Sequence, residues 1–197
     1  MVPSLDELRK NYESFDDGKL LRLATEEATS LRPEALELLE QIIKERRLSK
    51  NLTAAIDIQF EDLDEETLNE YCNLLRKQPC PICGTYGERL NATVIGTVMS
   101  FIVMSSYTKE LRIACPACLD KLNDKAVLQT MLLGWWEPLH GIINSLKAIS
   151  LNNKMKKEHH LNEANPTLKA FVRQSVGRIE LNRNNTEELR SLITYIR

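Results

Sequence analysis

The chain has 197 residues, of which 43% are apolar and 27% charged, an ordinary globular composition that excludes disorder throughout. The first residues lack a basic stretch followed by an apolar core, so we expect no secretory signal, a cytoplasmic location and reduced cysteines. The formal net charge of −2 hides an asymmetry. Residues 1–79 carry 18 acidic and 11 basic side chains (−7), and residues 80–197 carry 10 acidic and 15 basic side chains (+5). The positive charge of the second part hints at an anionic partner.

The N-terminal segment has the spacing of amphipathic helices. Ser4 with Glu7 three residues later is a capping-box pattern, and it predicts a short helix to about Tyr12. A second helix follows, and Pro33 suits the first position of a third. We interpret residues 14–48 as a helical hairpin whose apolar stripes pack into a core. A partner-docking surface on this hairpin is the alternative.

Residues 49–62 are interpreted as a connector, in which alternating apolar residues over 56–60 indicate a short extended piece. Asp64 is a candidate helix cap and predicts a helix to about Lys77. Cys72 lies on the apolar stripe of that helix. We therefore interpret it as a small buried hydrophobe rather than a metal ligand.

Two Cys-Pro-x-Cys pairs stand in the middle of the chain. They are Cys80 with Cys83 and Cys115 with Cys118, separated by residues 84–114. The two-residue spacing lets both thiolates of a pair bind one ion, and in a reducing compartment such pairs indicate zinc rather than disulfides. We therefore expect the four cysteines to hold one structural Zn²⁺ ion.

The two pairs are not equivalent. Gly84 follows the first pair and can adopt the positive φ that lets the chain leave the ion, so this pair is expected to form a knuckle. The second pair runs directly into an apolar-periodic segment, so Cys118 is expected in the first turn of a helix whose positive end stabilises thiolate charge. Four thiolates around Zn²⁺ leave a formal charge of −2. Basic residues placed in the sequence to offset it are Lys77, Arg89, Lys121 and Lys125.

A β-hairpin is expected between the two pairs. Alternation over residues 107–115 predicts one strand, and Ser105 with Ser106 is a turn signal before it. Residues 92–104 are apolar on both faces and predict a strand that is buried on two sides.

The expected order of elements is a knuckle, then a hairpin, then a helix that carries the last two ligands in its first turn. Over about residues 78–135 the chain resembles a treble-clef zinc finger, a relative of the zinc ribbons. The chain as a whole also resembles uncharacterised bacterial proteins that share Cys-Pro-x-Cys-Gly, Cys-Pro-x-Cys-Leu-Asp-Lys and Leu-Leu-Gly-Trp-Trp, the last at residues 132–136 here. These resemblances imply a four-cysteine zinc centre and bring no known activity.

The expected fold is therefore α+β, mainly α, with helical N- and C-terminal segments around a treble-clef-like zinc hairpin plus helix. Three regions are expected. Residues 1–62 form an N-terminal helical hairpin region and connector, residues 63–151 the zinc-finger module with following helices, and residues 152–197 a basic loop with C-terminal packing helices.

The segment after the zinc module combines Trp135 and Trp136 with an amphipathic run from Leu139 to Ile149. Charged residues and a proline interrupt it, so we expect no transmembrane span. We expect the two rings to cover the zinc module or to plug the helical core. The alternative is a helix on an anionic membrane surface, at the inner face of the membrane. The basic residues that favour this alternative are Lys147, Lys154, Lys156 and Lys157.

The three histidines carry weaker signals. His140 is a candidate fifth ligand, although four cysteines already complete a tetrahedral site. His159 and His160 lie in a lysine-rich stretch and are interpreted as a solvated loop. Beyond them we expect a helix that ends at Gly177 and a last helix capped by Asn185.

Three functions are compatible with these patterns. The first is a non-enzymatic scaffold or interaction module, in which zinc fixes a surface for a protein partner, with peripheral membrane contact as an addition. The second is nucleic-acid binding, which a pI near 6.0 and an aromatic content of 6% disfavour. The third is a thiol–disulfide oxidoreductase, disfavoured because two similar pairs have zinc spacing. The sequence has no catalytic triad or phosphate-binding glycine loop, so no enzyme is expected.

Overall fold

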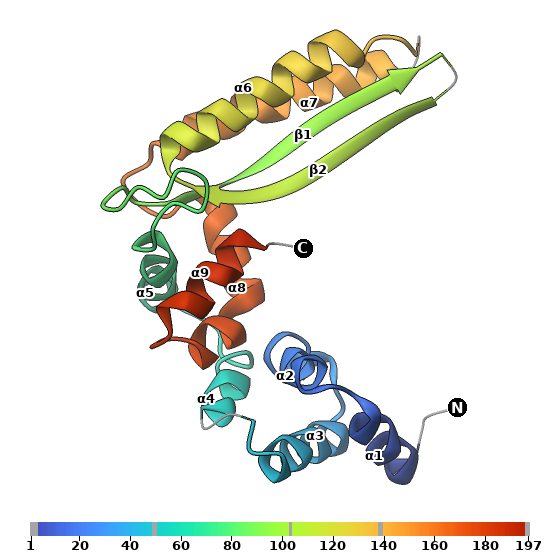
Figure 1. The fold of residues 1–197 in the computed structure, drawn as a ribbon, viewed down its shortest axis with the longest axis vertical. Helices are drawn as coiled ribbons and strands as arrows, with labels where there is room; N and C mark the ends of the chain where they lie inside the picture. The colour runs from blue at the N-terminus through green and yellow to red at the C-terminus, as the bar shows by residue number, and fades with distance from the viewer. Residues whose placement is uncertain (1–3, 49–50, 103, 138–139, 196–197) are drawn as a thin grey trace. The chain divides into compact units, whose positions relative to one another are not determined.

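The computed structural model describes residues 4–48, 51–102, 104–137 and 140–195. Most of these residues lie in helices, and the described part of the chain also contains one two-stranded antiparallel sheet (Figure 1). This confirms the expected class, α+β and mainly α. The chain divides into two compact units: unit 1 contains Met1–Tyr71 and Phe171–Asn185, and unit 2 contains Cys72–Ala170 and Thr186–Arg197.

Unit 1 is built from short helices. The first begins at the predicted capping box, in which Glu7 N–H donates to Ser4 Oγ (3.3 Å) and Ser4 N–H donates to Glu7 Oε2 (2.9 Å). Pro33 occupies the first helical turn expected for it. The elements are α1 (Leu5–Ser14), α2 (Asp17–Glu26), η1 (Ala28–Ser30), α3 (Pro33–Glu45), α4 (Leu52–Asp57), most of α5 (Glu65–Arg76) and most of α8 (Pro166–Leu181).

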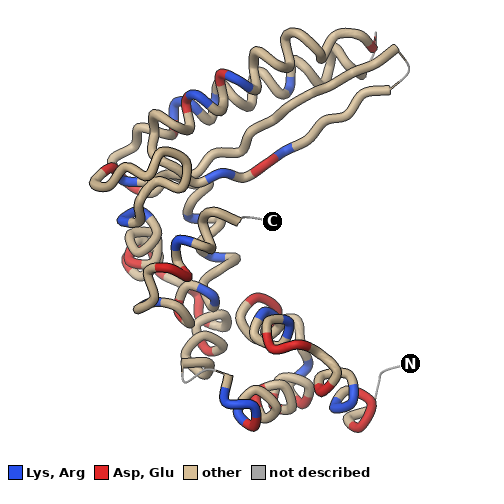
Figure 2. Tube along the Cα trace, in the orientation of Figure 1, with Lys and Arg blue, Asp and Glu red and all other residues tan. Residues whose placement is uncertain are grey.

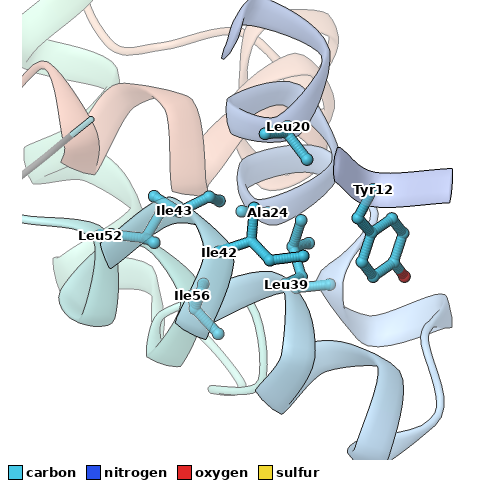
Figure 3. Close-up of a cluster of buried hydrophobic side chains, with 9 residues drawn as sticks. Tyr12, Leu20, Ala24, Leu39, Ile42, Ile43, Leu52 and Ile56 are labelled. Carbon is cyan, nitrogen blue, oxygen red and sulfur yellow. The ribbon is translucent and has the colours of Figure 1, made fainter. Parts of the chain in front are cut away.

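A cluster of buried apolar side chains from α1 to α4 forms the core of unit 1 (Figure 3). The helix α4 replaces the extended connector that the alternation indicated, so that expectation was wrong. Leu52 and Ile56 lie one helical turn apart, and both are buried in this cluster beside Leu39 and Ile43. The alternation was misleading because its last member, Phe60, is exposed. Tertiary burial thus decided the local structure.

The helix expected to end at Gly177 continues to Leu181, so glycine here does not terminate a helix. A Cβ at Gly177 would lie 2.6 Å from Ala55 O and would also overlap Thr25 O. The position therefore requires glycine because neighbouring backbone comes too close for a side chain.

Gly177→Ala is expected to destabilise unit 1 by about 1–3 kcal/mol, because the added methyl group overlaps rigid backbone oxygens. Urea unfolding monitored by circular dichroism measures the change. Gly18→Ala is the matched control, because that glycine is exposed in α2 and a Cβ there meets only the Asp16 carboxylate, at 3.2 Å. Equal effects of the two substitutions would argue against the close approach at Gly177.

Unit 2 contains the sheet and the two longest helices. Its elements are β1 (Asn91–Phe101), β2 (Met104–Ala114), α6 (Pro116–Leu133), α7 (His140–His159) and α9 (Thr186–Thr194), with the end of α5 and the start of α8. The strands pair antiparallel, from Asn91 opposite Ala114 to Phe101 opposite Met104. The helices α6 and α7 lie side by side along one face of this hairpin (Figure 1).

The hairpin turns earlier in the chain than the sequence indicated, between Phe101 and Met104 rather than at Ser105 and Ser106. Ser105 and Ser106 lie within β2, paired with Ser100 and Met99, so they do not form the turn. The apolar stretch is also not buried on both sides along its whole length, because Met99 and Phe101 are exposed. The sequence pattern could not reveal the exposure of these side chains, because the pattern shows only that a residue is apolar and not whether it is buried. Val103, within that stretch, lies outside the described residues.

The layer between β1 and the two helices is lined by small and polar side chains. Asn152 Nδ2 donates to Gly96 O (2.7 Å), and Asn152 Oδ1 accepts from Gly96 N–H (3.2 Å). The Asn152 carboxamide thus forms with Gly96 the two hydrogen bonds that the main chain of a neighbouring strand would form. Val98 N–H donates in the same way to Thr130 Oγ1 (3.2 Å). We call the buried polar residues of this layer the polar seam: Thr93, Ser100, Asn123, Thr130, Ser145 and Asn152.

The helix α7 includes the stretch that was expected to be a solvated loop, and His159 in its last turn is fully buried. His159 Nδ1 and His160 Nε2 each contact a carboxylate oxygen of Asp120 at 2.9 Å. The loop interpretation was wrong for His159, because Asp120, 39 residues earlier, partners its buried ring, whereas His160 lies in an exposed turn after the helix. Leu139 lies outside the described residues. Among those described, no helix is both long enough and apolar enough to cross a membrane.

Candidate metal centre

The first cysteine pair lies in a tight turn between α5 and β1. Gly84 N–H donates to Cys80 O (2.8 Å), and Cys80 N–H donates to Thr85 O (3.1 Å). Gly84 has φ +72°, which confirms the positive φ expected of it. A Cβ at Gly84 would meet nothing within 4 Å, so the backbone conformation, rather than lack of space, favours glycine there.

The second pair lies at the start of α6. Cys115 is the N-terminal cap residue, Pro116 follows at the first helical position, and Cys118 N–H donates to Cys115 O (3.0 Å). Cys118 therefore lies in the first turn, as expected. The positive end of the helix dipole favours negative charge on the two sulfur atoms.

The two pairs converge on one point. The four Sγ atoms of Cys80, Cys83, Cys115 and Cys118 all lie within 4.8 Å of one another. Cys83 Sγ and Cys115 Sγ are 3.7 Å apart, and Cys115 N–H donates to Cys80 Sγ (3.4 Å). A tetrahedral ion with metal–sulfur bonds of about 2.3 Å places its ligands about 3.8 Å from each other. The four thiols are thus positioned to bind one metal ion.

The protonation of the thiols follows their surroundings. Hydrogen bonds from Thr85 lower the pKa of Cys83 to about 6. Burial raises the pKa of Cys115 and of Cys118. A metal ion that binds the cluster must displace the protons of these buried thiols, so its affinity falls as the pH falls.

The sequence indicated four basic residues around the cluster and missed a fifth. Arg89 lines a pocket with Pro116, and its side chain is exposed, as are those of Lys77, Lys121 and Lys125. The missed cation is Arg76, which lines the same pocket and is 3% exposed.

Arg76 is held by main-chain oxygens. Its guanidinium donates to Leu90 O (3.1 Å) and to Asn162 O (2.9 Å). Its position four residues after Cys72 and eight after Leu68, on the apolar stripe of α5, was the signal that could have identified it.

The two tryptophans lie away from the cysteine cluster. Trp135 and Trp136 follow the C-terminal end of α6, while the cysteines are at its N-terminal end, about 27 Å away for a helix of this length. Their exposed fractions are 40% and 65%, so they neither cover the metal centre nor plug a core, and that expectation was wrong. His140 begins α7 at the same end as the tryptophans, which excludes it as a fifth ligand.

The four lysines that favoured a membrane or partner surface all lie on α7. Lys147, Lys154 and Lys157 are exposed, and Lys156 forms an ion pair with Asp124 (2.7 Å). They run from the middle of α7 to its last turn, where His159 contacts Asp120, two residues after Cys118.

Fold and site together define a mainly helical protein with a candidate four-cysteine metal centre. No family model, curated protein or solved structure matches this chain. The assignment of the centre therefore depends on the geometry of its four thiols.

Proposed function

We propose that Cys80, Cys83, Cys115 and Cys118 bind one structural zinc ion as thiolates. The supporting observation is the convergence of four sulfur atoms from two separated segments to within 4.8 Å. Four thiolates are a donor set that favours zinc, and they leave no open coordination position for water or substrate, as is typical of structural sites. The order of knuckle, hairpin and helix supports a treble-clef arrangement for this centre.

The proposed role of the protein is that of a non-enzymatic interaction module. The zinc ion would join the knuckle before β1 to the start of α6, and so fix the hairpin against the helix. The remainder of unit 2 then presents a surface of fixed shape to a partner. A closed four-thiolate centre supports this role over a catalytic one.

Removal of the metal tests this proposal. We expect one zinc per purified chain, and we expect a chelator to lower the unfolding temperature, because structural zinc contributes to folding free energy. Counting reactive thiols before and after chelation separates this role from the oxidoreductase alternative. Zinc-bound thiols should react only after chelation, whereas a redox pair reacts with the metal in place. A protein that contains no metal would contradict the proposal.

A further inference from the structure

Unit 2 has an apolar end, where the hairpin turns and α6 connects to α7. Thirteen of the nineteen large apolar side chains that are exposed in the described residues lie between positions 99 and 146. We call this end the apolar tip: residues 99–102, 104, 128–137 and 142–146. Its most exposed members are Ile102, Met104, Trp136, Phe101 and Leu132, each at least 64% exposed.

Hydrogen bonds join the two parts of the apolar tip. Ser100 Oγ on β1 donates to Leu133 O (3.0 Å) and accepts from Trp136 N–H (2.9 Å). Glu137 Oε2 accepts from Gly141 N–H (2.6 Å) and so connects the end of α6 to the start of α7. The exposed side chains therefore belong to one ordered surface.

The helices at this end carry their apolar residues on the outside. Over residues 141–152 the buried positions of α7 are small or polar and repeat at spacings of four and three: Gly141, Ser145, Ala148 and Asn152. Those of α6 include Asn123, Ala126 and Thr130. Facing outward from the two helices are Leu128, Met131, Leu132, Ile142, Ile143 and Leu146.

This arrangement is the reverse of a helix packed in water, where the large apolar residues face the core. Helices packed in a bilayer instead meet through small residues and hydrogen-bonding side chains, and their large apolar side chains face lipid. The polar seam and the outward-facing leucine and isoleucine side chains therefore favour lipid as the medium around the apolar tip.

The apolar tip is exposed on both faces of the two-layer arrangement. Position 100 faces the helices, since Ser100 bonds to Leu133 O, so Phe101 faces away from them. Its partner across the hairpin is Met104. On α7, Ile143 lies between the buried positions Gly141 and Ser145 and is exposed, so it points away from the hairpin. One protein surface would cover one of these faces, whereas a lipid leaflet surrounds both.

The length and charge of this end also fit one leaflet. The sequence from Ala126 to Trp136 has no charged residue, and at about 1.5 Å per residue it spans about 15 Å, half of a hydrocarbon core of about 30 Å. Lysines begin only further back along β2, α6 and α7 (Figure 2). Residues 125–157 carry five lysines and one acidic residue, Glu137, which complements anionic lipid headgroups.

We propose that the apolar tip inserts into one leaflet of an anionic lipid membrane, with Lys109, Lys125 and Lys147 at the level of the headgroups. This names the partner of the interaction module proposed above and rests on that function. The one acidic residue of the tip enters with its charge partnered, because Glu137 accepts the Gly141 N–H and lies 3.2 Å from His140 Nδ1.

Sedimentation with vesicles tests the insertion. Zinc-loaded protein is mixed with vesicles of phosphatidylglycerol and phosphatidylcholine, or of phosphatidylcholine alone. Both tryptophans of the chain lie in the apolar tip, so their emission should shift to the blue on binding. We expect binding to the anionic vesicles and an affinity about a hundredfold lower for Phe101→Asp, because the new charge would enter hydrocarbon. Phe60→Asp, at an exposed phenylalanine of unit 1, is the matched control and should bind as the unsubstituted protein does.

Failure to bind anionic vesicles, or equal binding by Phe101→Asp, would overturn the proposal. A dimer in lipid-free solution that Phe101→Asp converts to a monomer would also overturn it, because the tip would then meet a second copy of the chain. Zinc content is measured in the same samples. Protein that contains no zinc as purified but binds the vesicles would refute the metal proposal alone. Protein that contains zinc but does not bind the anionic vesicles would refute the insertion alone.

Discussion

Replacing Cys115 with serine is expected to abolish zinc binding and to lower the unfolding temperature of the protein. Cys115 lies where the two pairs meet: it caps α6, its N–H donates to Cys80 Sγ, and its Sγ lies 3.7 Å from Cys83 Sγ. A serine hydroxyl stays protonated at neutral pH and cannot replace a thiolate. Zinc contributes about 10–16 kcal/mol to the folding of small finger peptides, so its loss should be the largest single effect in unit 2. Elemental analysis and a thermal melt measure both changes.

The matched control for Cys115→Ser is Cys72→Ser. Cys72 is the fifth cysteine of the chain, buried on α5 and absent from the group of converging thiols. That variant loses some packing but should keep one zinc per chain. Cobalt substitution adds a spectroscopic readout, because a tetrahedral thiolate site gives intense visible bands. Retention of zinc by Cys115→Ser, or its loss from Cys72→Ser, would show that the ligand set is wrong.

Asn152→Ala is expected to destabilise unit 2 by about 3 kcal/mol, because it leaves two buried polar groups without these partners at about 1–3 kcal/mol each. They are the N–H and the C=O of Gly96, while Asn123 Nδ2 loses one contact and keeps the one to Asn152 O. No water reaches them, since Asn152 and Asn123 are both fully buried. Denaturant unfolding, with the zinc content shown to be unchanged, measures the loss.

The neighbouring Asn153 provides a matched control, because its side chain is exposed on the same helix. Asn153→Ala should change the free energy of unfolding by less than about 0.5 kcal/mol. If the two alanine variants were equally stable, the carboxamide of Asn152 would not be replacing a strand neighbour.

Features set by near neighbours in the sequence were predicted well. The capping box of Ser4 and Glu7, the cap at Asp64 and the positive φ of Gly84 were all confirmed. Each depends on backbone chemistry within about five residues. The convergence of the two cysteine pairs was also predictable, because the spacing within each pair already specifies a shared ion.

Features set by distant partners were not predicted. His159 is buried because Asp120 lies beside it, and nothing near either residue in the sequence indicates that contact. Gly177 looks like a helix terminator, but its role is set by the approach of Ala55.

The two tryptophans were expected to cover the zinc module or to plug the helical core, because large aromatic side chains are mostly buried. That rule fails where the small and polar side chains face inward, as they do along the polar seam.

The zinc content of the purified protein, measured before and after treatment with a chelator, tests the metal centre most directly. We predict one zinc ion per chain, four thiols that become reactive only on chelation, and a lower unfolding temperature once the metal is removed. A chain that carries no metal as purified, and whose unfolding temperature does not respond to the chelator, would contradict this account.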